Sequence, residues 1–211
     1  LGQTLRNTGL LSLLVGVIQV ASCTMIGYGL ARFKFRGSKL AMAMVIVIML
    51  VPYHVISIAQ YLGFVYFGVG SFTINLTDSF WPSLILAFTG LGIKEGLYIY
   101  LLREFFKSLP AELEEAAYID GAGTIRTFFQ VSFPMAMPGI MVATLYTFLG
   151  SMEEAQGTLL VGLARIKTMP VEMYGIILDY PGQAGAVFAI LLMIPAAVMI
   201  LAMKQLPAVS R

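Results

Sequence analysis

Two charged residues interrupt an otherwise apolar stretch and are the first candidates for chemistry. Lys94 and Glu95 lie near the middle of residues 80–102. A charge at membrane depth is costly, and it indicates a function or an ion-pair partner. Adjacent residues on a regular helix point about 100° apart, so these two side chains pair poorly with each other. Because glycines surround them, the helix could be broken here, which is typical of a solute path. The alternative is a helix that begins near Gly96, with both side chains reaching the outer membrane interface.

A second polar group lies at the end of a later apolar run. Glu153, Glu154 and Gln156 follow the uncharged residues 127–152. Their oxygens could accept hydrogen bonds from solute hydroxyl groups or contact a solute-delivering protein. They could equally belong to an ordinary hydrated helix end. With Lys94 and Glu95, these residues form the candidate solute pathway.

One long polar segment separates two apolar runs, and its pattern predicts two short helices. Pro110 suits a helix start, and residues 111–120 are helix-forming with an acidic first turn that suits the helix dipole. Gly121 is typical of a helix C-terminus. Thr124 could cap a second helix that reaches about Val131.

The first of these helices carries a stripe of decreasing side-chain size. Leu113, Ala117 and Gly121 are spaced one helical turn apart. The small end of this stripe would let a partner backbone approach closely. A plug for a cleft in another protein and a helical hairpin on the lipid headgroups both fit this pattern.

The composition indicates a membrane protein. Of 211 residues, 59% are apolar and 11% are charged, against roughly 25% charged in soluble domains. The mean hydropathy is +0.88. A net charge of +2 implies no field for nucleic acid. One cysteine and one histidine argue against a disulfide or a metal site.

The uncharged and nearly uncharged runs predict five membrane-spanning helices, because one span needs about 20 apolar residues. Between the second and third spans we expect an interfacial loop with a short helix. The first residue is leucine, so we expect an earlier span to be missing. The five expected spans cover about 10–31, 40–61, 80–103, 134–155 and 184–204.

The basic residues predict the orientation of these spans. Nine of the 13 lysine and arginine residues lie in the loop after the first span, the loop after the third span and the C-terminal tail. Basic loops face the cytoplasm. We therefore expect these two loops and the C-terminus to be cytoplasmic.

A signature in the long polar segment resembles a known family. Glu115-Ala116-Ala117 is followed four residues later by Gly121 and then by Val131-Ser-Phe133-Pro134. This is similar to the "EAA" signature of binding-protein-dependent ABC importer permeases. That signature is Glu-Ala-Ala, three residues, Gly, nine residues, Ile, any residue, Leu and Pro. Val131 and Phe133 depart from it conservatively. The carbohydrate-uptake branch is also similar at residues 7–37, 102–106 and 109–110.

The resemblance implies an all-α polytopic helix bundle, the core of a type I ABC importer permease. One transmembrane domain would cover residues 1–211, in the bacterial inner membrane, with a cytoplasmic coupling loop at about 104–133. The coupling helix would dock on an ATPase through Glu115, Ala116, Ala117, Asp120, Gly121 and Pro134.

The resemblance also implies partners. These are a second permease subunit, of a different chain, a cytoplasmic ABC ATPase dimer, an extracytoplasmic solute-binding protein and membrane lipid. ATP and magnesium would be bound by the ATPase. The sequence contains no G-x-x-x-x-G-K-[ST] phosphate loop, so we expect a transport subunit without a cofactor, metal or catalytic site of its own.

The resulting hypothesis is a permease that moves a sugar or related solute from a binding protein across the membrane by alternating access. A peptide, amino acid or polyamine is the alternative cargo, for which Glu95, Glu153 and Glu154 would be counter-charges. An intramembrane enzyme and a membrane scaffold are remote alternatives. Against the enzyme stand the absence of H-E-x-x-H and G-x-S-x-G.

Overall fold

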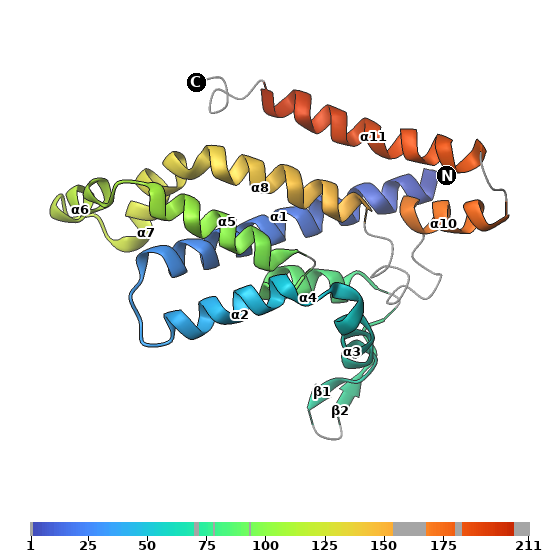
Figure 1. The fold of residues 1–211 in the computed structure, drawn as a ribbon, viewed down its shortest axis with the longest axis horizontal. Coiled ribbons are helices and arrows are strands. Elements are labelled where there is room, and N and C mark those ends of the chain that lie inside the picture. The colour runs from blue at the N-terminus through green and yellow to red at the C-terminus, as the bar shows by residue number, and fades with distance from the viewer. Residues whose placement is uncertain are drawn as a thin grey trace.

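The computed structural model describes residues 2–69, 72–77, 79–92, 94–153, 168–179 and 183–204. These residues form an elongated arrangement of helices with one small β-hairpin (Figure 1). The all-α bundle expected from the sequence is thus confirmed apart from the hairpin. Its two longest helices are α1 (Gly2–Arg32) and α11 (Gln183–Lys204).

Helix α5 (Glu95–Ser108) lies at the centre of the bundle. It packs against α1, α2 (Ser38–Leu50) and α8 (Phe133–Glu153). Its buried face follows helical spacing. Glycines permit close approach at two of these contacts, since a Cβ on Gly27 would lie 3.1 Å from the Arg103 backbone nitrogen, and one on Gly96 would lie 2.8 Å from the Val45 oxygen. The buried apolar face of α5 consists of Tyr98, Ile99, Leu102 and Phe106.

The second expected span is not one continuous helix. It divides into α2 and α3 (Tyr53–Val65), which are bent by 106° from each other. Val51 is extended and Pro52 caps α3. Proline has no N–H to donate and disfavours helical backbone in the residue before it, which accounts for the break.

The third expected span is also broken. Helix α4 (Trp81–Thr89) ends at Gly90, which has a left-handed φ of 78°. Helix α5 then starts after Lys94, a non-glycine residue with a φ of 59°. The sequence indicated a break among these glycines, and the structure places it at residues 90–94.

A β-hairpin replaces the short helix expected between the second and third spans. Strands β1 (Phe67–Val69) and β2 (Phe72–Ile74) pair antiparallel, with Phe67 opposite Ile74. The hairpin projects from the end of α3, away from the bundle (Figure 1). Its β2 side chains are all exposed.

The long polar segment forms a compact cap at one end of the molecule. Helix α6 (Ala111–Ile119) is followed by α7 (Thr124–Thr127) and the π-helical turn η1 (Phe128–Ser132), which continues directly into α8. The second short helix expected here is therefore the start of a longer helix. Its N-cap is Gly123, not Thr124. Figure 1 shows α6 and α7 where α1 and α5 end, far from the N-terminus.

Near the N-terminus, α10 (Met169–Asp179) packs against α1 and α11. The sequence did not indicate α10. Among the described residues, two helical stretches are long and apolar enough to cross a membrane, Gly2–Arg32 and Thr124–Met152, or three if the bent α2–α3 pair is one span. The prediction of five spans is therefore supported for two or three of them and stays a prediction for the others.

Candidate functional site

The segment that carries the EAA-like signature presents one face to solvent. Glu115, Ala116 and Asp120 are exposed, and Ala117 is half-buried. Ile119 and Ile125, which flank the turn after α6, are 86% and 76% exposed. Such exposed apolar groups, clustered at a turn, are typical of a surface that contacts another protein.

Gly121 sets the shape of this turn. It has a φ of 83°, a conformation that glycine adopts without steric cost. The Gly121 N–H donates to the Tyr118 oxygen at 3.0 Å, and the Ala122 N–H donates to the Ala117 oxygen at 2.9 Å. This pair of bonds is a Schellman motif. It ends α6 as the sequence predicted and directs the chain towards α7.

Glu114, not Glu115, is the buried acid of α6. Its Oε1 accepts a hydrogen bond from Arg32 Nε at 3.0 Å and one from Ser132 Oγ at 2.6 Å. Arg32 also donates from a terminal nitrogen to the Leu109 oxygen at 3.0 Å. We call this group of Arg32, Glu114, Ser132 and the Leu109 carbonyl the clasp. Arg32 lies in the last turn of α1, where a cation is favoured by the helix dipole.

An aromatic cluster lies in the same end of the bundle, among α1, α5 and η1. Tyr28 contacts Phe106 and Phe128 with ring centroids 5.2 Å and 4.7 Å apart. Phe128 also contacts Phe133 edge-on at 5.8 Å. The contacts join α1, α5, η1 and the first residue of α8. Aromatic pairs at these separations add to the stabilisation from burial alone.

Sequence reasoning missed the clasp as a unit. It counted Arg32 among the basic residues of a loop, treated Glu114 only as an acid that suits the helix dipole, and assigned Glu115 to docking. Arg32 and Glu114 are 82 residues apart, so no local spacing pattern connects them. The adjacent acids Glu114 and Glu115 point about 100° apart on a helix, which lets one be buried while the other is exposed but does not indicate which.

The two charged residues of the α4–α5 break lie in different environments. Lys94 is exposed, whereas Glu95 is fully buried. A Cβ on Gly92 would lie 2.6 Å from Glu95 Oε1, so the carboxyl group lies directly against a residue without a side chain. Among the described residues, no basic side chain forms an ion pair with Glu95.

The remaining pathway candidates are largely undescribed. Glu154 and Gln156 lie outside the described residues. Glu153 is the last residue of α8, and the structure describes its backbone but not its side chain. The part of the pathway prediction that concerns these three residues therefore lies outside the described residues.

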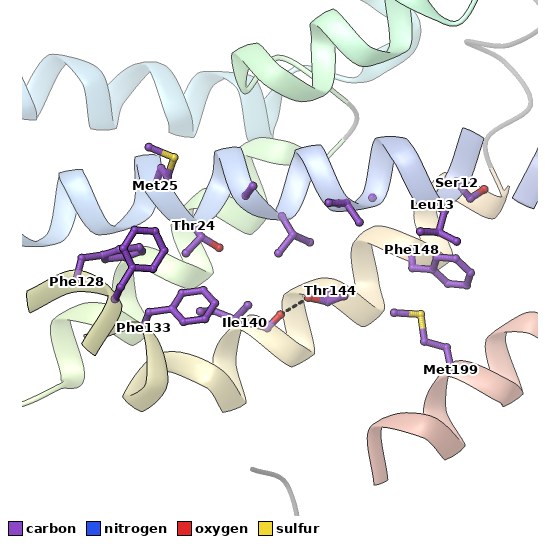
Figure 2. A pocket seen from close by; sticks show the side chains of 15 residues that line it. Ser12, Leu13, Thr24, Met25, Phe128, Phe133, Ile140, Thr144, Phe148 and Met199 are labelled. Carbon is purple, nitrogen blue, oxygen red and sulfur yellow. Dashed lines mark hydrogen bonds between the residues drawn. The ribbon is translucent and has the colours of Figure 1, made fainter. Parts of the chain in front are cut away.

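A groove of about 560 Å³ runs between α1, η1 and α8. In Figure 2, Phe128 and Phe133 lie towards one end, and Phe148, Ser12 and Leu13 towards the other. Most of its lining is apolar. It differs in this respect from a site for a hydroxyl-rich solute, which needs several polar partners.

Comparison with known proteins identifies the family of this chain. The sequence profile of the family described as "Binding-protein-dependent transport system inner membrane component" matches residues 24–206. The Galactooligosaccharides transport system permease protein GanQ of Bacillus subtilis is 26% identical over 186 residues, 86% of this chain and 62% of that protein. The Maltodextrin transport system permease protein MdxG of the same organism is 32% identical over 68% of this chain and 48% of its own length. The chain thus spans between about half and three-fifths of these relatives.

Solved structures share the fold. A bacterial alginate ABC transporter, in complex with an alginate pentasaccharide-bound periplasmic protein, aligns with a TM-score of 0.74 at 15% identity, covering 94% of this chain and 75% of that chain. The MetNI methionine ABC transporter, in an inward-facing conformation, aligns with a TM-score of 0.71 at 16% identity, covering 96% and 92%.

Proposed function

The chain belongs to the family of binding-protein-dependent transport system inner membrane components, and from this premise we propose that it is a transmembrane permease subunit of an ATP-driven sugar importer. It would move the solute from an extracytoplasmic binding protein into the cell by alternating access. It would be non-catalytic, and a partner ATPase would bind ATP and magnesium and hydrolyse ATP.

The names of the relatives support a carbohydrate cargo. GanQ and MdxG are permease proteins for galactooligosaccharides and maltodextrin, and SugB of Mycobacterium tuberculosis, 34% identical over 139 residues, is one for trehalose. The solute of this chain would be a sugar of this general class, as the sequence hypothesis holds.

The observation that carries the proposal is the exposed face of α6 and its turn. Glu115, Ala116, Asp120 and Gly121 are all exposed at one end of the bundle, beside the strongly exposed Ile119. We infer that this face, with Ala117 and Pro134, docks on the ATPase. The apolar groups supply buried area on docking, and the carboxylates supply charge complementarity.

The topology we propose has five spans. Helices α1, α8 and α11 would each cross the membrane, and the α2–α3 and α4–α5 pairs would each form one broken span. Helix α6, the loop after α1 and the C-terminus would face the cytoplasm. A second permease subunit, of a different chain, would complete the pathway.

We also propose that the α4–α5 break contributes to the solute pathway. Glu95 is fully buried in this conformation, so it would meet solute only after the elements around the break move apart. Lys94, exposed beside it, would contact solute or a neighbouring subunit. Glu153, Glu154 and Gln156 remain candidates for the outer end of the pathway.

Reconstitution tests the function. The full-length chain, with the partner permease, ATPase and binding protein expressed beside it, is placed in proteoliposomes. We expect ATP-dependent uptake of radiolabelled maltodextrin, galactooligosaccharide or trehalose, and ATP hydrolysis stimulated by the loaded binding protein. Uptake of amino acids or polyamines, with none of any sugar, would contradict the carbohydrate assignment.

Crosslinking tests the docking face. Ala117→Cys is combined with Cys23→Ala, which removes the native thiol, already buried. We expect a crosslink to the ATPase that changes with bound nucleotide. The matched control is Gly63→Cys on α3, which lies well away from α6 (Figure 1) and from which we expect no crosslink. Equal crosslinking at both positions would contradict docking through α6.

A further inference from the structure

The most deeply buried side chain of helix α6 is that of Glu114. Of its nine residues, Glu114 alone is buried, while Leu113, Tyr118 and Ile119 remain exposed. An ordinary surface helix is held by an apolar stripe. Here the most deeply buried group is a carboxylate, and the apolar Ile119 is 86% exposed.

The Glu114 carboxylate connects this helix to three other parts of the chain. Through Arg32 it reaches the end of α1, and through Ser132 it reaches η1 and hence α8. Arg32 extends the connection to the Leu109 carbonyl at the end of α5. Four elements therefore meet around one carboxylate.

Hydrogen bonds hold such a junction differently from apolar packing. Charge-assisted bonds are short and directional, so they fix the distance and orientation between elements, whereas apolar surfaces can slide. A buried ion pair is often no more stabilising than well-packed apolar residues of similar volume. Its specific contribution here is geometric.

We propose that Glu114 is a positioning residue that transmits displacements of α6 to α1 and α8 through the clasp. This rests on the proposed function, in which the ATPase moves α6. When α6 moves, the end of α1 and the start of α8 move with it, because the clasp joins them. Glu115 contacts the ATPase, whereas Glu114 connects the docked helix to the membrane helices.

The test compares four variants in the reconstituted complex. Glu114→Gln and Arg32→Gln each remove a charge of the clasp, and the double variant removes both. Glu112→Gln is the matched control, because it neutralises an exposed acid of the same helix. Solute uptake and ATP hydrolysis are measured together, and their ratio is the readout, since that ratio does not depend on the amount of folded complex.

We expect the Glu114→Gln and Arg32→Gln variants to hydrolyse ATP but to move less solute for each ATP, by a factor of about five or more. A factor of about five is the lower end of typical coupling between sites. The double variant is expected to be no worse than either single variant, because all three lack the same interaction. Glu112→Gln is expected to match the wild type. A ratio within about twofold of wild type for Glu114→Gln, or multiplying effects in the double variant, would overturn the proposal.

Two further arms separate this proposal from the proposed function. If the wild-type complex takes up none of the sugars, the importer assignment fails, and hydrogen exchange of the α6 amides then tests whether the clasp holds α6. Glu114→Gln is expected to speed that exchange, and Glu112→Gln is expected to leave it unchanged. Equal exchange rates in both variants would show that the clasp does not hold α6. If Glu114→Gln does not accumulate, Ser132→Ala, which removes one bond and keeps the ion pair, is expected to change both readouts in the same direction.

Discussion

Neighbouring residues in this chain differ sharply in environment, and the differences follow from the local backbone. Glu114 is buried in the clasp while Glu115 is exposed, and Glu95 is buried while Lys94 is exposed. Glu114 and Glu115 share a helix, on which adjacent side chains point about 100° apart, whereas Lys94 precedes α5 in a left-handed conformation. A single residue step thus separates a group that holds the structure from one that can meet a partner.

At the residue scale, Gly90→Ala is expected to destabilise the α4–α5 break. Alanine at a left-handed φ costs about 1–2 kcal/mol, and its Cβ would lie 2.9 Å from Ile26 Cδ1. The midpoint of thermal denaturation in detergent should fall. Gly63→Ala is the control, because a Cβ there meets nothing within 4 Å; an equal fall in both variants would contradict the argument.

Thr8→Val is expected to loosen α10. The Met169 N–H, at the start of α10, donates to Thr8 Oγ1 at 2.7 Å, and early helix N–H groups have no intrahelical partner. Leaving this buried donor unpaired costs about 1–3 kcal/mol. Hydrogen exchange over residues 169–179 should speed up in Thr8→Val and stay near wild type in Thr8→Ser, which keeps the hydroxyl. Unchanged exchange in Thr8→Val would show that this bond does not hold α10.

At the element scale, three helical ranges could be predicted from the sequence. The runs expected at 10–31, 134–155 and 184–204 correspond to α1, α8 and α11, since a long apolar run leaves few alternatives to a helix. The glycines indicated the break near Gly90, but the separation of α2 from α3 at Pro52 and the pairing of β1 with β2 depend on local backbone geometry. Hydropathy averaged over a span does not detect such geometry.

The π-helical turn η1 gives an element-scale prediction. A π-bulge contains about one residue more than the equivalent α-helical turn, so deleting Val131 should restore regular helix and rotate α7 by about 100° relative to α8. Phe128 would then turn away from Tyr28, and α6 would lose its register with Ser132. We expect solute uptake per ATP to fall, whereas Val131→Ala, which keeps the turn, should leave it near wild type. Normal uptake per ATP in the deletion variant would show that the turn is not needed for coupling.

At the scale of the whole molecule, the proposed topology predicts which surfaces a membrane-impermeant maleimide can reach. In a Cys23→Ala background, Phe35→Cys, in the loop after α1, should be labelled only in inside-out vesicles. Phe72→Cys, at the exposed hairpin, should be labelled only in right-side-out vesicles. Labelling of both positions from the same side would contradict the arrangement of spans between them.

The candidate site could be predicted only in part. The motif around Glu115 and Gly121 is local, so the sequence revealed the turn and the exposed acid. The clasp joins residues from opposite parts of the chain, and only the folded backbone brings Arg32 to Glu114. Glu95 lies against Gly92, which is near it in the sequence, but the packing of α1 on α5 joins segments that are far apart in the sequence.

The burial of Glu114 on an otherwise exposed helix has a consequence for how such subunits diverge. The most exposed residues of α6, such as Glu115 and Ile119, make little internal packing, so they can mutate without unfolding the bundle. If α6 docks on an ATPase as proposed, selection can change its exposed residues to fit a different ATPase, or to let several permeases bind the same ATPase. Glu114 would meanwhile keep the helix in the same position on the bundle. Among related permeases, we expect sequence variation to be greatest at the exposed residues of α6 and smallest at Arg32, Glu114 and Ser132.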